Sequence, residues 1–86
     1  MPVIARFYGI LIRMFFDDRA PPHFHAVYGE HELLVGISPI RIISGHAPAR
    51  VRSMVLEWAA LHQDDLIADW AHCQRGEAPL PIEPLE

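Results

Sequence analysis

The sequence predicts an α+β fold, in which an antiparallel sheet of about five short strands packs on one long C-terminal helix. Over residues 1–44, apolar and polar residues alternate with a period of two, and Val, Ile, Phe and Tyr are frequent, as is typical of strands. From Pro48 onward, apolar residues recur at spacings of three and four, which is typical of an amphipathic helix. Burying the apolar face of the sheet under the helix gives a two-layer domain.

The length of 86 residues is that of one small domain. We expect a single domain over residues 1–86, with sheet over 1–44, helix over 48–75 and an extended Pro-rich tail over 77–86. Cys73 is the only cysteine, which excludes an intrachain disulfide and a cysteine-rich zinc cage and predicts a reducing, cytoplasmic setting. No apolar run reaches the roughly 18 residues that span a bilayer, so no membrane association is expected.

Charge is unevenly distributed along the chain. The formal net charge is −4, which argues against non-specific binding of nucleic acid. All seven basic residues are arginines, and six of them lie in residues 1–56 together with four acids; residues 57–86 hold one arginine and seven acids. The mildly basic first part could therefore still contact RNA or an acidic partner.

The first predicted hairpin turns at Tyr8 and Gly9. The expected facing pairs are Phe7 with Ile10, Ala5 with Ile12, and Val3 with Met14, which gives one fully apolar face. The residues expected on the other face are Ile4, Arg6, Leu11 and Arg13. Tyrosine is unfavourable where a turn needs positive φ, which counts against a type I′ turn here.

The second predicted hairpin turns at Gly29 and Glu30, where glycine in first place suits a type II′ turn. The expected pairs are Tyr28 with His31, Ala26 with Leu33, and Phe24 with Val35. The other face is then expected to carry His23, His25, Val27, Glu32, Leu34 and Gly36. After a turn at Ser38 and Pro39, residues 40–43 form the last predicted strand.

The helical segment has a regular apolar stripe. Its members are Val51, Val55, Trp58, His62, Leu66 and Trp70. Pro48 suits the first helical turn and Gly76 suits the position after the last one. The segment "HQDD" could divide it into two helices, but we predict one long helix.

His23 and His25 are the first candidate for chemistry. Side chains at i and i+2 of a strand lie on one face, about 6.5–7 Å apart at the backbone, so both imidazoles can bind one ion. Asp17, Asp18 or Glu32 could supply a third ligand. Two histidines and a carboxylate suit zinc, or manganese or iron with open positions, and Gly36 opposite His23 is expected to leave room for a ligand. This is the hypothesis of a metal-binding module or small metal-dependent hydrolase.

The same residues support a metal-free alternative. A histidine can act as general acid and base near neutral pH, and an arginine can stabilise a negatively charged transition state. His25 or His23 with Arg19, and with His46 at the start of the helix, would form a minimal ribonuclease. In a third interpretation, the histidines only complete the sheet or contact a partner. The sequence leaves open whether the chain is an enzyme at all.

The chain also resembles a family of small bacterial proteins known as domain of unknown function number 4160. The matching blocks are "MPVIARFYGILIRMFFDD", "APPHFHAVYG", "SGHAPAR", "VLEWAALHQDDLIADW" and "PIEPL". The resemblance implies a small protein partner from a neighbouring gene, in an arrangement like a toxin–antitoxin pair. We therefore predict first a small cytoplasmic component of toxin–antitoxin type that acts through a protein partner, with the segment Asp17–His25 as its functional surface. RNA could also bind the mildly basic first part, and a second copy of the chain could cover the exposed edges of so small a sheet.

Overall fold

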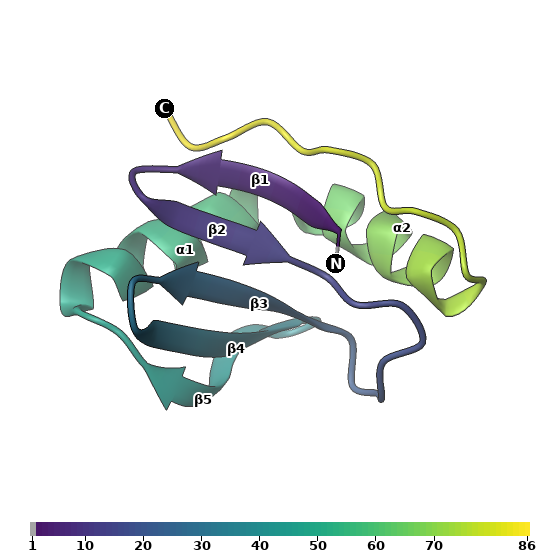
Figure 1. Ribbon diagram of the computed structural model, residues 1–86, viewed down its shortest axis with the longest axis horizontal. Coiled ribbons are helices and arrows are strands. Elements are labelled where there is room, and N and C mark those ends of the chain that lie inside the picture. Colours follow the sequence, from purple (N-terminus) through teal and green to yellow (C-terminus); the bar gives the residue numbers. More distant parts are fainter. Residues whose placement is uncertain (1) are drawn as a thin grey trace.

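The computed structural model describes residues 2–86, which form one five-stranded antiparallel sheet and two helices (Figure 1). The strands are β1 (Val3–Phe7), β2 (Ile10–Arg13), β3 (His23–Tyr28), β4 (His31–Ile37) and β5 (Ile40–His46). The helices are α1 (Ala49–Leu61) and α2 (Gln63–Gln74). The strands pair in chain order, β1-β2-β3-β4-β5, because each connection simply reverses the chain. The predicted α+β class is confirmed.

Both predicted hairpins are present in the expected central register. Phe7 pairs with Ile10 and Ala5 with Ile12 in the first, and the pairs from Tyr28–His31 to Phe24–Val35 form in the second. Gly29 alone has positive φ in its turn, as a type II′ turn requires. Tyr8 and Gly9 both have positive φ, at 49° and 79°. The objection to a type I′ turn at Tyr8 was therefore wrong.

The start of β1 departs from the predicted register. Val3 pairs with Arg13 instead of Met14, and an irregularity separates Val3 from Ala5. This extra residue turns Ile4 from the predicted outer face into the core, where only 2% of its surface is exposed. The amide of Met14 instead donates a hydrogen bond to the carbonyl of Pro2 at 3.2 Å.

Strand β5 is longer than the predicted segment of residues 40–43. It continues through Ser44 and Gly45 to His46, which pairs with Glu32. A register shift between Leu34 and Val35 accommodates an extra residue on β5, and Gly45 follows with φ of 100°. His46 is therefore the last residue of a strand, and its expected place at the start of the helix was wrong.

Two helices replace the one long helix that we predicted. The break is at His62, whose φ of −124° and ψ of 26° are not helical. Asp64 and Asp65 then lie in the first turn of α2, where negative charge interacts favourably with the helix dipole. The alternative reading of "HQDD" as a break is the correct one. Neither helix is long and apolar enough to cross a membrane.

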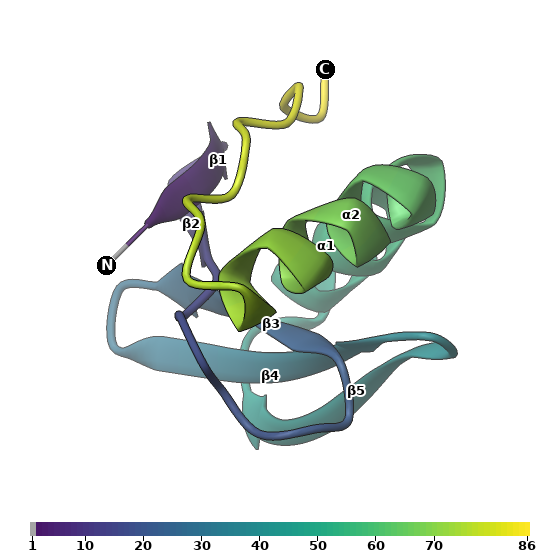
Figure 2. The same ribbon diagram turned by 90° about the vertical axis from the view of Figure 1, so that its right-hand side faces the viewer.

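Both helices lie on one side of the curved sheet, and the core fills the space between them (Figure 2). Trp58 of α1 is at its centre, fully buried, with ring centroids 5.5 Å from Phe7 and 5.6 Å from Phe24. Residues 77–86 contain no helix or strand and run beside β1, where the amide of Ile82 donates to the carbonyl of Ile4 at 2.8 Å. The opposite face of the sheet has no helix on it.

Candidate metal centre

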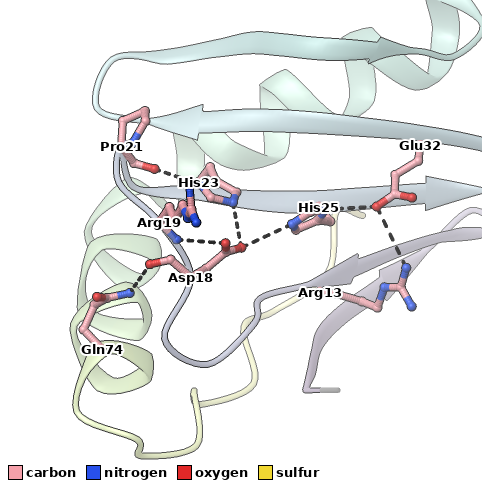
Figure 3. A network of polar contacts seen from close by, with 8 residues as sticks. All are labelled: Arg13, Asp18, Arg19, Pro21, His23, His25, Glu32 and Gln74. Carbon is pink, nitrogen blue, oxygen red and sulfur yellow. Dashed lines mark hydrogen bonds and ion pairs between the residues drawn. The ribbon is translucent and has the colours of Figure 1, made fainter.

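Three side chains meet where β3 begins. His23 and His25 are the first and third residues of that strand, and Asp18 belongs to the loop that joins β2 to β3. Figure 3 shows the Asp18 carboxylate placed between the two imidazoles. The strand spacing thus places two nitrogen donors on one face, and the returning loop adds an oxygen donor.

The loop that carries Asp18 is attached to the end of α2. The side-chain amide of Gln74 donates to the carbonyl of Asp18 at 3.0 Å, and the amide of Asp17 donates to the carbonyl of Cys73 at 3.3 Å. The ring of Trp70, also on α2, lies 5.2 Å from the ring of His23. The position of Asp18 is therefore fixed by contacts with the second layer of the fold.

His23 presents one particular nitrogen to Asp18. Its Nδ1 lies 2.8 Å from the carbonyl oxygen of Pro21, and since a carbonyl only accepts, Nδ1 must carry the hydrogen. The other nitrogen, Nε2, lies 2.9 Å from Oδ2 of Asp18. It donates a hydrogen bond to this carboxylate when it carries a proton, and a metal ion between the two atoms would take the place of that proton. A backbone carbonyl on the far nitrogen is a common way to orient a metal-binding histidine.

His25 is oriented in the same manner by a carboxylate. Its Nδ1 donates to Oε2 of Glu32 at 2.9 Å, and its Nε2 faces Oδ2 of Asp18 at 3.6 Å, too far for a hydrogen bond. This Nε2 is buried and has no hydrogen-bond partner in the described part of the chain. The edge of the Phe15 ring contacts the imidazole, with centroids 4.4 Å apart. A buried nitrogen with a free lone pair is the donor a metal ion requires.

Asp18 is also held in one orientation. Its Oδ1 accepts a hydrogen bond from the amide of Arg19 at 2.8 Å, which leaves Oδ2 facing both histidines. Burial works to raise the pKa of this carboxyl, but the Arg19 hydrogen bond and the contacts with His23 and His25 outweigh it and lower the pKa below its ordinary value. Asp18 is therefore a carboxylate at neutral pH, the form that binds metals.

The distances between the donors suit a small divalent ion. Oδ2 of Asp18 lies 2.9 Å and 3.6 Å from the two Nε2 atoms, and all three donors lie within 4.8 Å of one another. Donors about 2.0–2.1 Å from a tetrahedral zinc ion lie roughly 3.3 Å apart. Two of the three separations therefore bracket the spacing that a bound ion would impose.

Comparison with protein families supports the resemblance described above. Residues 9–71 match the family described as "Domain of unknown function (DUF4160)". The chain belongs to this family. No curated protein and no solved structure matches it.

In this family member, the structure separates the predicted ligands into two groups. Asp18, His23 and His25 come together, whereas Asp17 is exposed and its amide donates to the carbonyl of Cys73. The Glu32 carboxylate accepts a hydrogen bond from Nδ1 of His25, the nitrogen on the side away from Asp18, and it lies 4.0 Å from Arg13. It thus orients a donor and is not itself one of the three.

Of the residues in the metal-free alternative, the structure sets His46 apart from His23. Arg19 contributes its backbone amide to Asp18, and its side chain is exposed. On β4, His46 pairs with Glu32 and His23 pairs with Gly36. These two positions are four residues apart, so His46 lies roughly 13 Å from His23 along the strand direction, at about 3.3 Å per residue. Gly36 does not leave room for a ligand, since a Cβ there would lie 3.1 Å from the carbonyl oxygen of Pro39.

Four cavities lie away from the three donors. One of about 380 Å³ is lined by the junction of α1 and α2, and one of about 410 Å³ by that junction and the C-terminal residues. One of about 210 Å³ lies between α2 and the tail, and one of about 160 Å³ lies at the β1–β2 turn. None of these four is lined by Asp18, His23 or His25.

Proposed function

We propose that the chain is a divalent-metal-binding module, with Asp18, His23 and His25 as ligands of one zinc, manganese or iron ion. The observation that carries this proposal is the orientation of all three donors. Asp18 Oδ1 accepts from Arg19, His23 Nδ1 donates to Pro21, and His25 Nδ1 donates to Glu32. Each donor thus has its other polar atom occupied, as is usual around a metal centre.

The ion would join three parts of the fold. It would hold the β2–β3 loop to the start of β3, and through Asp18 and Trp70 it would hold both to α2. In a domain of this size, with a small core, such a link stabilises the folded state, and the stabilisation rises with the logarithm of the free metal concentration above the Kd. A structural role of this kind needs no substrate cavity, and it is favoured over the alternatives of a metal-dependent hydrolase and a metal-free ribonuclease.

The proposal is tested by titrating zinc, manganese or iron(II) into untagged protein and measuring bound metal and the tryptophan fluorescence, to which Trp70 beside His23 contributes. We expect one ion per chain, a changed tryptophan signal, and loss of both in His23→Ala, His25→Ala and Asp18→Asn. His31→Ala, which removes an exposed histidine at the start of β4, is the matched control and should bind normally. Full binding by all three ligand variants, or none by the wild type, would overturn the proposal.

We also propose that this cytoplasmic protein acts with a small protein partner in a toxin–antitoxin-like pair. The family resemblance suggests it, and the uncovered face of the sheet, described below, supports it. Induced expression in a bacterial host tests the toxin role: growth arrest by the wild type, but not by His23→Ala or His25→Ala at equal protein levels, is the expected result. Normal growth with every version would contradict a toxin role.

A further inference from the structure

The face of the sheet opposite the helices, here called the bare face, carries a continuous apolar stripe. Leu11 of β2 pairs with Val27 of β3, and Leu34 of β4 is the diagonal neighbour of Val27. Ile43 is the extra residue of β5, and its Cδ1 lies 3.4 Å from where a Cβ of Gly36 would be, which places it on the same face. All four side chains are only half-buried. The solvent-facing side of an antiparallel sheet usually carries polar residues. A row of aliphatic side chains, one from each of four adjacent strands, is therefore unusual on such a face.

Arginines surround this stripe. Arg6 pairs with Leu11, Arg13 pairs with His25, and Arg41 pairs with Gly36, so all three lie on the bare face. Arg6 and Arg41 are exposed, and the Arg13 guanidinium lies 5.6 Å from the Phe15 ring centroid, over its face. An apolar centre bordered by arginine is a composition enriched at protein–protein interfaces.

Two of the three arginines on the bare face have no carboxylate partner within residues 2–86: Arg13 lies 4.0 Å from Glu32, but Arg6 and Arg41 form no ion pair there. Among its strand residues, Glu32 is the only acid, and that carboxylate is already bound to His25. The acids of residues 57–86 belong to the helices and tail, on the other side of the sheet. Because complementary charge favours association, the occupant of this face should supply carboxylates as well as apolar side chains.

We propose that the bare face docks a segment of a partner protein that combines acidic and apolar residues. Aliphatic side chains fill the stripe, where single-stranded nucleic acid would instead need aromatic rings for base stacking. A polyanion as large as RNA is further disfavoured by the chain's net charge of −4. The proposal goes beyond metal binding and does not require it, although His25 belongs to both surfaces.

A phage-displayed library of random 12-residue peptides tests the proposal directly. The wild-type chain is immobilised and the selection is carried out in the presence of a chelator, so that the outcome is independent of metal binding. We expect enriched peptides to combine Asp or Glu with Leu, Ile or Phe. Their amide-shift perturbations should map to β2–β5 on the bare face. The peptides should bind the double variant Arg6→Glu/Arg41→Glu at least tenfold more weakly than the wild type, measured as a higher dissociation constant.

The control is Arg50→Glu/Arg75→Glu, which changes the net charge equally at exposed positions of the helical side and should bind the peptides as the wild type does. A selection without enrichment, or with basic peptides enriched, would overturn the proposal. Equal binding by the two double variants would do so too. Binding of a uridine oligonucleotide at the bare face, or concentration-dependent self-association through it in sedimentation, would assign the face to RNA or to a second copy instead.

Discussion

At the scale of single residues, the donor atoms depend on neighbours that a sequence pattern does not reveal. The spacing of His23 and His25 predicts their common face from strand geometry alone. That Asp18 and not Asp17 meets the histidines follows from contacts distant in sequence, such as the hydrogen bond from Gln74 to the Asp18 carbonyl, which no local pattern contains. Glu32 was predicted as a ligand because it lies diagonally across the hairpin, and only the side-chain orientation shows that it binds the outer nitrogen of His25.

The role of Glu32 leads to a prediction about affinity. We expect Glu32→Leu to weaken zinc binding about ten- to a hundredfold, because the carboxylate accepts from Nδ1 of His25 and so orients its Nε2 toward the ion. Glu32→Gln keeps an oxygen acceptor for Nδ1 and should lose less. Competition with a fluorescent chelator measures both dissociation constants, and Glu30→Gln, in the adjacent turn, controls for loss of charge. An unchanged affinity in Glu32→Leu would remove Glu32 from the site.

At the scale of elements, hairpins were more predictable than helix ends. Each hairpin has a period-two pattern that fixes its register, because a slip of one residue would expose the core face. The stripe from Val51 to Trp70 keeps nearly helical spacing through the break at His62 and therefore could not reveal it. The extra residues in β1 and β5 were missed for a similar reason, since a bulge depends on the partner strand.

The end of β5 gives a second prediction. Gly45 has φ of 100°, and a Cβ there would overlap the backbone carbonyl of Glu32. Gly76 also has positive φ, but nothing lies within 4 Å of its Cβ position. We therefore expect Gly45→Ala to lower the free energy of unfolding by about 3 kcal/mol or more, and Gly76→Ala by about 1 kcal/mol. Urea unfolding measures both, and similar losses would contradict the close packing of β5 on β4.

At the scale of the whole molecule, the C-terminal residues connect the two layers. Ile82 bonds to β1, the Trp58 indole donates to the carbonyl of Glu83 at 2.8 Å, and the amide of Leu80 donates to Oδ1 of Asp69 at 2.9 Å. Three prolines exclude a helix for this segment, but its contacts are all long-range, so no local pattern predicts them. The apolar stripe of the helices likewise gave no reason to expect a buried acid, and Asp69 is only 2% exposed.

Asp69 makes this connection sensitive to pH. Burial raises the pKa of its carboxyl above the ordinary value, with a further contribution from Asp65, and the Leu80 hydrogen bond and His72 only partly oppose this. Its Oδ2 has no hydrogen-bond partner among residues 2–86. The unfolded chain therefore loses this proton at lower pH than the folded protein does. Between the pKa of the unfolded chain and the higher pKa of the folded protein, the folded state holds more protons. The contribution of Asp69 to stability therefore falls as pH rises from about 4 toward neutral.

The variant Asp69→Asn should remove this penalty, because its amide oxygen can still accept from Leu80 while no charge is buried. We expect the variant to have a higher free energy of unfolding than the wild type at pH 7, and the difference to vanish near pH 3, where Asp69 is protonated in both states. Urea unfolding at both pH values measures the difference. Asp64→Asn, exposed in the first turn of α2, should instead be less stable than the wild type at pH 7, because it loses a favourable interaction with the helix dipole. If Asp69→Asn were destabilised at pH 7 and unchanged at pH 3, the ionised carboxylate would be the stabilising form, and the C-terminal segment would be held by charge despite its burial.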